Sequence, residues 1–415
     1  MTRGSFVIAA LCVIAQYYDY HLFGFLAAKI STHFFSTSDP IIQLMRTYII
    51  MFIGVTAKPI GAIILGRIGD TYGRFATMLI SLSGTAFASL VISLTPSYNE
   101  IGVFSALILL LCRMCVASLV SSGTDGIRLY IYEKISQKKQ CLGNGAVTFS
   151  TQLGSFIAAL SAWFFSLDFM PEYSWRIAFM TGTLMGLAAI YIRLKFFQES
   201  EEISKSDPNY DLYKDHNSIR IATKNFKLFL YCSILAGCIG STYQFIIIFF
   251  GTYNFQVLKI VPHYQMQFYT SIGVMIYMCF AIIGGICADY LGKKLVSNIA
   301  TFLLFIVTIL FTLMVKFSQF SLSLYLLLIM LIPFITMPAL AYLKQSIPKS
   351  IRYRLFSLAH ATGSMFISAP TAFLSTYLYY STGVAWIPMI YFLTTIIIMI
   401  YIINKLDSIC NTNSL

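Results

Sequence analysis

Two charged residues lie deep inside long apolar segments, where they could do chemistry together. Asp19 stands near the middle of segment 6–30, and Arg113 near the middle of segment 101–130. A carboxyl group can bind and release a proton, and a guanidinium can hold a carboxylate through paired hydrogen bonds. We therefore expect Asp19 to carry a proton and Arg113 to be its partner. Protonation of Asp19 would then free Arg113 for an anionic ligand; a permanent structural ion pair is the alternative.

Further polar residues occur in the same or neighbouring segments. Lys58 could face the interior or extend toward the nearer membrane surface. Asp125 and Arg128, close to one end of their segment, are expected to form a local pair. Two histidines, His21 and His360, are either packed polar side chains or groups that touch a ligand or a proton. The remaining candidates for lining a central cavity are Tyr18, Gln152, Tyr243 and Gln244.

The elements that must position these residues are membrane-spanning helices. The chain has 415 residues, of which 58% are hydrophobic and 11% charged, so too little polar sequence remains to cover an apolar core in water. A bilayer core of about 30 Å needs about 20 apolar residues per helical crossing. The sequence therefore predicts an all-α membrane protein with about twelve crossings, at 6–30, 43–66, 74–94, 101–130, 143–167, 175–197, 226–253, 267–288, 295–317, 321–344, 355–380 and 384–403.

The net charge is +12, and the lysines and arginines are distributed along the chain as expected of a membrane protein. If both termini are cytoplasmic, most lysines and arginines fall on the cytoplasmic side, as the positive-inside rule requires. Only Lys29, Arg176, Lys259 and Lys316 fall near outer ends. This distribution argues against nucleic acid as a partner. We expect a multi-pass protein of a plasma membrane, the inner membrane of a bacterium, with both termini inside.

The nine cysteines follow no metal or disulfide spacing. The nearest approach to such a motif, Cys112 and Cys115, sits inside an apolar segment, where cysteine is best read as a packing residue. We therefore expect no metal and no cofactor.

A polar stretch divides the crossings six and six. Residues 198–225 mix both charge signs with a proline and are predicted to be a cytoplasmic linker between halves at 1–197 and 226–415. A short motif supports this division, because "GRIGDTYGRF" in the first half has a fainter copy, "GICADYLGKK", in the second. The pairs, all at one offset, are Gly66 with Gly285, Asp70 with Asp289, Gly73 with Gly292 and Arg74 with Lys293.

The motif resembles the hallmark loop of the major facilitator superfamily, between helices two and three of a half. Its glycines allow a tight turn, and Asp70 and Arg74 can bond helix ends across the interface between halves. We interpret both copies as a conformational gate. Phe75 stands where the family usually has a basic residue.

Three further stretches resemble one branch of that superfamily, the metabolite:proton symporters, which includes proline/betaine, 2-oxoglutarate, citrate and shikimate carriers. They are "QYYDYHLFG" in the first helix, "KPIGAIILGRIGD" before the motif, and "YSWRIAFMTGTLMGLAAIYIRLKFFQESEE" across helix six. Helix eleven, from "IPKSIRYRLFSLAHATGS" onward, is also similar. The resemblance implies twelve helices in two pseudo-symmetric halves.

Helix four departs from the branch. Arg113, Tyr130 and Glu133 match its pattern, and Asp125 follows two residues after the place of a family glutamate. The residues that differ are Val116, Ala117, Ser121, Ser122 and Gly123.

These observations predict a secondary transporter for a small zwitterionic or anionic metabolite, working by alternating access, coupled to protons and functional as a monomer in the bilayer. An uncoupled facilitator or exchanger and a transport-inactive, sensor-like relative remain alternatives. An integral-membrane enzyme is disfavoured because no metal cluster or catalytic carboxylate set is present at a membrane surface. An ATP-driven pump is disfavoured because the phosphate-binding glycine-lysine motif is missing.

Overall fold

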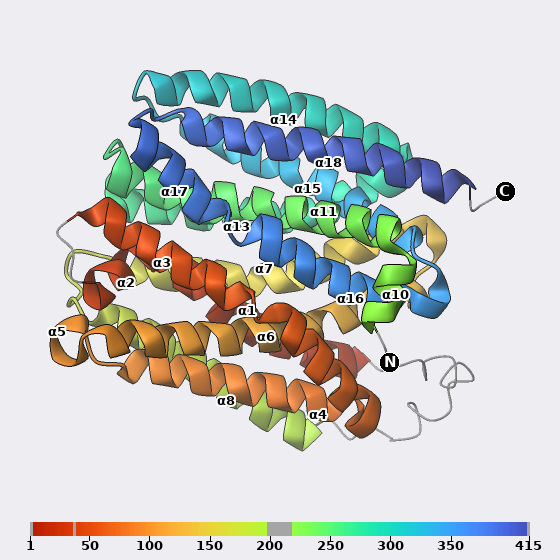
Figure 1. Cartoon of the computed structure of the whole chain (residues 1–415), viewed down its shortest axis with the longest axis horizontal. Coiled ribbons are helices and arrows are strands. Elements are labelled where there is room, and N and C mark those ends of the chain that lie inside the picture. The colour runs from red at the N-terminus through yellow and green to blue at the C-terminus, as the bar shows by residue number, and fades with distance from the viewer. Residues whose placement is uncertain (1–2, 36–38, 197–217, 413–415) are drawn as a thin grey trace.

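Long helices running side by side build the protein, as the computed structural model shows (Figure 1). The structure describes the backbone of residues 3–35, 39–196 and 218–412 and most of their side chains. The side chains left out lie at 3–9, 66–67, 69–75, 121–123, 126–127, 130, 134, 196, 218–219, 350 and 411–412. Helix α1 begins and α18 ends at the same end of the bundle, on the right of Figure 1. We call this the terminal end.

The first six predicted crossings are formed by α1 to α8. Their bounds are α1 (Arg3–Phe25), α2 (Ala27–Phe34), α3 (Pro40–Val55), α4 (Lys58–Leu94), α5 (Tyr98–Ile101), α6 (Val103–Lys134), η1 (Gln137–Lys139), α7 (Gln140–Phe164) and α8 (Ser174–Phe196).

The last six crossings are formed by α10 to α18. Their bounds are α10 (Ser218–Lys224), α11 (Phe226–Tyr243), η3 (Gln244–Phe249), α12 (Phe250–Thr252), η4 (Tyr253–Val257), α13 (His263–Leu291), α14 (Lys293–Lys316), α15 (Leu322–Gln345), η5 (Lys349–Ile351), α16 (Arg352–Gly363), η6 (Ser364–Ser368), α17 (Thr371–Thr382) and α18 (Ile387–Thr412). Most of the predicted linker, residues 198–217, lies outside the described residues, and its last part is helical as α10.

Nine helical stretches of the described chain are long and apolar enough to cross a membrane. The other three predicted crossings correspond to α1 with α2, to α7, and to α16 with α17. Helix α7 carries asparagine, glutamine, serine and threonine on its buried surface, and the last pair is interrupted by a π-helical turn and Pro370. Helix α7 is therefore less apolar because it lines the interior of the bundle, whereas α16 and α17 are each only 12 residues long.

Several helix ends follow directly from sequence. The Asp39 side chain accepts a hydrogen bond of 2.8 Å from the backbone N–H of Ile41, with Pro40 at the first helical position. This arrangement starts α3, because proline lacks a donor that would be unsatisfied there. Helix α17 ends at Gly383, whose φ of 70° is readily adopted only by glycine.

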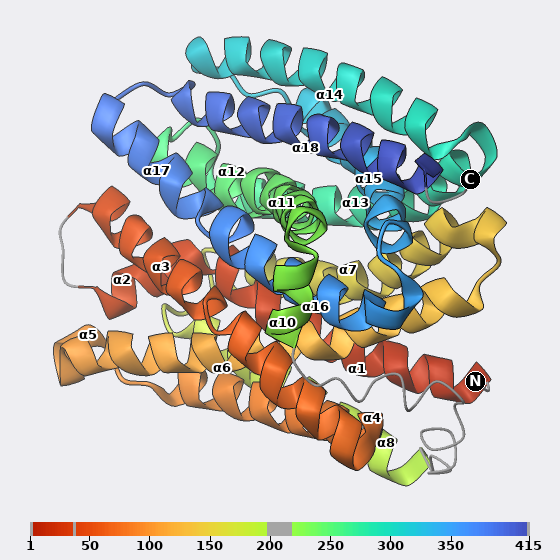
Figure 2. The same cartoon turned by 45° about the vertical axis from the view of Figure 1, so that its right-hand side comes forward.

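The two copies of the repeated motif differ in backbone. Gly292 has a φ of 96° and separates α13 from α14, as expected for a tight turn. In the first copy the prediction of a glycine turn is wrong, because residues 66–75 stay helical within α4. The ribbon of α4 instead turns back at the terminal end (Figures 1 and 2).

The two halves meet most closely where α7 packs against α13. A side chain at Gly145 would collide with the backbone carbonyl of Ala281, and one at Gly285 would collide with the carbonyl of Cys141. Small residues at a helix contact let the two backbones approach closely. These glycines therefore set the spacing between the halves near the terminal end.

Candidate functional site

One face of α1 carries three aromatic rings toward the contact between the halves. Tyr17, Tyr20 and His21 fall three and four residues apart, so they share one side of the helix. The His21 ring centroid lies 5.5 Å from that of Tyr17 and 5.1 Å from that of Tyr20. The spacing of three and four residues places these rings on one helix face, but Tyr17 and Tyr20 were not identified as candidates from the sequence.

Two cations lie against this aromatic face. The Lys58 Nζ is 5.0 Å from the Tyr20 ring centroid, and the Arg113 guanidinium carbon is 5.5 Å from it and 4.5 Å from the Phe23 ring. Arg113 Nη1 also donates a hydrogen bond of 3.3 Å to the Tyr20 carbonyl. Both cations are buried, so Lys58 faces the interior rather than a membrane surface. Cation–π contacts of this kind gain strength when water is removed.

The C-terminal half contributes a tyrosine pair to the same region. Tyr243 lies 5.1 Å from His21 and 5.6 Å from Tyr277, measured between ring centroids. Its hydroxyl forms a hydrogen bond of 2.5 Å with the hydroxyl of Ser155 on α7. We call this assembly the central cluster: Tyr17, Tyr20, His21, Lys58, Arg113, Ser155, Tyr243 and Tyr277. It joins both halves through side chains alone.

Asp19 lies beside the central cluster, with its carboxylate against Gly182 of α8. Its side chain is 2% exposed, and a side chain at Gly182 on α8 would collide with its carboxylate oxygen Oδ1. Among the described residues no ion pair joins Asp19 to Arg113, and Oδ1 has no hydrogen-bond partner. The predicted direct ion pair is therefore not formed at contact distance between these described residues, although the two charges still act on each other electrostatically. On a helix, adjacent residues point in different directions, so Asp19 faces α8 while Tyr20 faces Arg113.

Of the other candidates from the sequence, Tyr18 packs against a helix of its own half, whereas Gln152 and Gln244 are buried with side-chain oxygens that lack a partner among the described residues. Tyr18 faces α8, where its hydroxyl donates to the Ala178 carbonyl at 2.9 Å. Gln152 and Gln244 are buried, and the Oε1 atom of each has no hydrogen-bond partner among the described residues. Gln244 begins the π-helical turn η3, a feature often found at functional sites.

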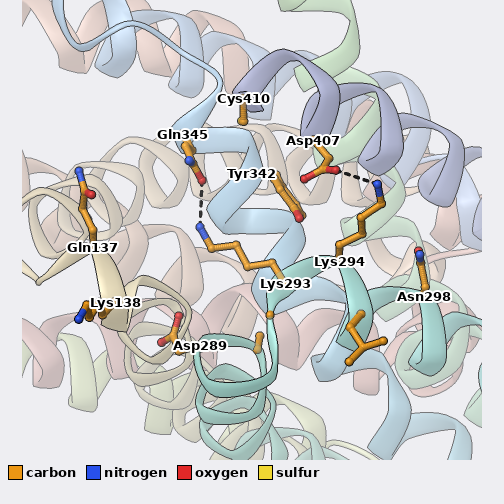
Figure 3. A pocket seen from close by; sticks show the side chains of 13 residues that line it. Gln137, Lys138, Asp289, Lys293, Lys294, Asn298, Tyr342, Gln345, Asp407 and Cys410 are labelled. Carbon is orange, nitrogen blue, oxygen red and sulfur yellow. Dashed lines mark hydrogen bonds and ion pairs between the residues drawn. The ribbon is translucent and has the colours of Figure 1, made fainter. Parts of the chain in front are cut away.

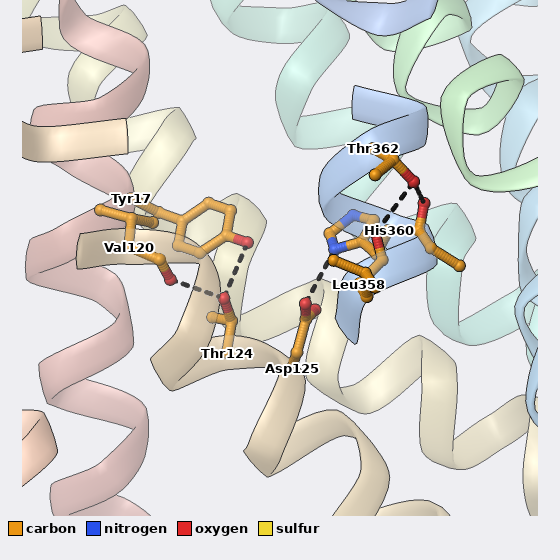
Figure 4. Close-up of polar contacts among 8 residues, drawn as sticks. Tyr17, Val120, Thr124, Asp125, Leu358, His360 and Thr362 are labelled. Atoms are coloured by element: carbon orange, nitrogen blue, oxygen red, sulfur yellow. Dashed lines mark hydrogen bonds and ion pairs between the residues drawn. The ribbon is translucent and has the colours of Figure 1, made fainter. Parts of the chain in front are cut away.

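At the terminal end, Asp125 on α6 meets His360 on α16. The distance from His360 Nδ1 to Asp125 Oδ2 is 3.0 Å, as Figure 4 shows. The predicted local pair of Asp125 with Arg128 is wrong: no ion pair joins them within the described part of the chain. Helix α16 approaches α6 closely enough to supply the partner from the opposite half.

A second set of contacts joins the halves beside this pair. Lys344 on α15 donates a hydrogen bond of 2.6 Å to the Asn144 side chain on α7. Its ammonium and the Arg352 guanidinium lie 5.3 and 5.6 Å from the Tyr132 ring of α6. Arg352 also pairs with Glu133 at 3.6 Å. We call Asp125, Tyr132, Glu133, Asn144, Lys344, Arg352 and His360 the gate cluster. No motif in the sequence pointed to Asn144 or Lys344.

The second copy of the repeated motif completes this end. Asp289 accepts hydrogen bonds from the backbone N–H groups of Cys141 and Leu142. Lys293 donates one of 2.9 Å to Gln345. These residues line a surface pocket of about 680 Å³, drawn in Figure 3. The predicted helix-end contact between the halves is therefore present in this copy, whereas the side chains of Asp70 and Arg74 lie outside the described residues.

The opposite end of the bundle is also bridged. Gln267 on α13 donates a hydrogen bond of 2.9 Å to the Phe25 carbonyl, and Gln256 donates one of 3.4 Å to the Pro40 carbonyl. Both cross from the C-terminal half to the N-terminal half. Contacts among the described residues thus bridge the two halves at both ends of the bundle.

Comparisons with known proteins agree with this architecture. A protein of Staphylococcus aureus (strain COL) that is named as a proline/betaine transporter is 27% identical over 398 residues, which covers 94% of this chain and 84% of that protein. The citrate-proton symporter of Salmonella typhi is 25% identical over 312 residues, covering 74% of this chain and 69% of the symporter.

Two solved structures share the fold at low identity. The D-xylose-proton symporter superposes with a TM-score of 0.75 at 13% identity, with 96% of each chain covered. The human organic anion transporter MFSD10 gives 0.68 at 11% identity, with 97% of this chain and 99% of that chain covered. The family model of the Major Facilitator Superfamily matches residues 9–365. The chain therefore belongs to the Major Facilitator Superfamily, and it is a multi-pass membrane transporter with the predicted twelve-helix fold, not an enzyme.

Proposed function

We propose that the chain takes up a small zwitterionic or anionic metabolite, either a proline- or betaine-like osmolyte or a di- or tricarboxylate, by alternating access in symport with protons. The observation that carries this proposal is the central cluster. There, Lys58 and Arg113 lie buried at the contact between the halves with no ion-pair partner among the described residues. Two buried cations without a close ion-pair partner are costly unless a ligand supplies one.

The chemistry of the cluster favours a ligand with a carboxylate and a compact cation. Arg113 can hold a carboxylate through paired hydrogen bonds, with Lys58 as a second positive charge. The rings of Tyr17, Tyr243 and Tyr277 offer π faces to an ammonium group. Proline, betaine and citrate, which the names of related proteins mention, all carry at least one carboxylate.

Asp19 is the proposed proton carrier. A buried carboxyl without an ion-pair partner is costly in its charged form, so its protonation state can change with conformation. Its neighbour Tyr20 contacts Arg113. We propose that a shift of α1 at this point changes the surroundings of Asp19 and of the ligand-binding cation together. The coupling runs through the helix rather than through a direct Asp19–Arg113 pair.

We further propose the orientation that the charge distribution favours. The terminal end would be cytoplasmic, because most lysines and arginines fall there, and the membrane would be a bacterial inner membrane. The halves at 1–197 and 226–415 would move against each other about the central cluster. One chain contains all parts of this cluster, which supports function as a monomer.

Uptake by the purified protein in proteoliposomes tests the proposal. With labelled proline, betaine or citrate outside and an inside-alkaline pH gradient, we expect accumulation above equilibrium, which a protonophore abolishes. Simple equilibration would favour an uncoupled facilitator. Ligand-dependent thermal stabilisation without any flux would favour the sensor-like alternative. Absence of both flux and stabilisation with all three ligands would contradict the proposed substrate class.

A further inference from the structure

His360 and Asp125 form a buried contact that exists only while the halves are closed at the terminal end. Asp125 has a side chain 1% exposed, and His360 has one 22% exposed. The two come from α16 and α6 (Figure 4). Because one partner belongs to each half, any movement that opens this end must break the contact. Because the imidazole is partly exposed, it can exchange protons with water.

Charged residues on α6 and on the elements that pack against α16 can influence the protonation of the His360–Asp125 contact. On α6, Asp125 is followed by Arg128, and on α15 Lys344 lies close enough to act on Asp125 electrostatically. Helix α16 adds Arg352 and Arg354, α4 adds Lys58, α10 adds Arg220 and Lys224, and α11 adds Lys227 and Tyr231. The other charged residues of α4, Arg67, Asp70 and Arg74, have side chains outside the described set. The positive charge of Lys344 thus competes with a proton on His360 for the Asp125 carboxylate.

Histidine is the side chain that ordinarily changes charge between pH 5 and 8. With a proton on both ring nitrogens, His360 is positively charged, so its hydrogen bond to the Asp125 carboxylate is also an ion pair. Without the extra proton, the neutral imidazole can donate from Nδ1 to the carboxylate only in the tautomer that carries its hydrogen on Nδ1. The tautomer with hydrogen only on Nε2 cannot form this hydrogen bond. Asp125 Oδ1 has no hydrogen-bond partner among the described residues, so this buried carboxylate depends on the contact that its Oδ2 makes with His360.

We propose that His360 and Asp125 form a proton-binding site in the gate between the halves, and that a proton taken from cytoplasmic water holds this gate closed. Loss of that proton to the same water weakens the link and favours opening. By thermodynamic reciprocity, closure must also strengthen proton binding. The inference rests on the proposed function only for the statement that the terminal end is cytoplasmic. In a proton symporter, such a site would slow further proton entry when the cytoplasm becomes acidic.

A short polar path joins this site to the central cluster. Tyr17, a member of that cluster, donates a hydrogen bond of 3.5 Å to Thr124 on α6, and Thr124 precedes Asp125 in the chain (Figure 4). Thr124 in turn donates to the Val120 carbonyl at 2.9 Å. Movement of Tyr17 on ligand binding would therefore act on the same helical turn that holds Asp125.

The native thiol of Cys141 reports the state of the gate. It is fully buried where α7 meets α13, so opening of the terminal end should expose it. We would measure its alkylation by N-ethylmaleimide in the full-length protein in lipid nanodiscs from pH 5.5 to 8, using peptide mass spectrometry. His360→Asn is the matched variant, because its amide nitrogen can replace Nδ1 as a donor but cannot titrate. At each pH we would divide the Cys141 alkylation rate of the wild type by that of the variant, because this ratio cancels the intrinsic pH dependence of thiol alkylation.

We expect this ratio to rise about fivefold from pH 5.5 to 8, the lower end of typical coupling effects. A ratio independent of pH would overturn the proposal, as would an Asp125→Asn protein that keeps the wild-type pH profile. Glu133→Gln serves as a control, because it removes a gate contact without a histidine; it should raise the rate at every pH and leave the slope intact. Cys238, buried within one half, should stay unreactive in every variant that is folded. The alkylation experiment needs no substrate, so its outcome does not depend on whether the uptake experiment supports the proposed function.

Discussion

The Asp289 carboxylate of the C-terminal half caps α7 of the N-terminal half, with 2.8 Å from the backbone nitrogen of Leu142 to Oδ2 and 3.0 Å from that of Cys141 to Oδ1. The first N–H groups of a helix have no partner within it and carry partial positive charge. A carboxylate from the opposite half therefore satisfies two donors at once. This contact ties closure of the terminal end to the repeated motif that carries Asp289.

Asp289→Asn should weaken this closure. The amide keeps one acceptor but loses the charge, and loss of a helix cap costs about 0.5–2 kcal/mol. Alkylation of Cys141 should rise severalfold, and exchange between conformations should change in rate, while the equilibrium affinity for ligand stays within a few fold. Asp407→Asn is the control, since Asp407 lines the same pocket but pairs with Lys294. A large loss of affinity in Asp289→Asn with unchanged Cys141 alkylation would assign Asp289 to the ligand site instead.

The sequence predicted the helices well, because apolar length is a local signal, and it predicted the glycine turn of the second motif copy but not that of the first. It also placed Arg113 deep inside the bundle, whereas it left Lys58 between the interior and the membrane surface. It failed on close pairings: Asp125 bonds His360 rather than Arg128, and the Asp19 carboxylate lies against Gly182 of α8 without a close ion pair to Arg113. Which face of a helix meets which neighbour depends on packing between distant segments. A single sequence carries no record of that packing, and Asn144 and Lys344 were missed for the same reason.

The membrane orientation can be tested at two exposed lysines at opposite ends of the bundle. Lys349 lies between α15 and α16 at the terminal end, and Lys316 ends α14 at the other end. In intact cells, a membrane-impermeant maleimide should label Lys316→Cys strongly and leave Lys349→Cys at the background of the wild-type cysteines. After the cells are permeabilised, both should react. The reverse pattern in intact cells would place the terminal end outside and refute the proposed topology.

Arg113→Gln should weaken ligand binding by about ten- to a hundredfold, because hydrogen bonds to charged groups contribute about 1.5–3 kcal/mol each. Lys58→Gln should have a smaller effect, since a lysine ammonium makes no bidentate contact. Calorimetric titration of the purified variants measures both. Arg176→Gln is the matched control: Arg176 donates to the carbonyls of Ser93 and Thr95, away from the central cluster. It should lower thermal stability but leave affinity unchanged, and equal losses of affinity in Arg113→Gln and Arg176→Gln would point to a structural role for Arg113.

The role of Asp19 in proton coupling is tested by Asp19→Asn. The amide resembles the protonated carboxyl in shape and charge, so the variant should fold, bind ligand and exchange it between preloaded vesicles. It should nevertheless lose uphill accumulation driven by an imposed pH gradient, because no proton can be bound or released at this position. Gly182→Ala offers an independent check, since the added methyl group would collide with the carboxylate and should perturb coupling without removing the acid. If Asp19→Asn accumulates ligand under the gradient to the wild-type level, Asp19 is not the coupling residue and its burial is structural.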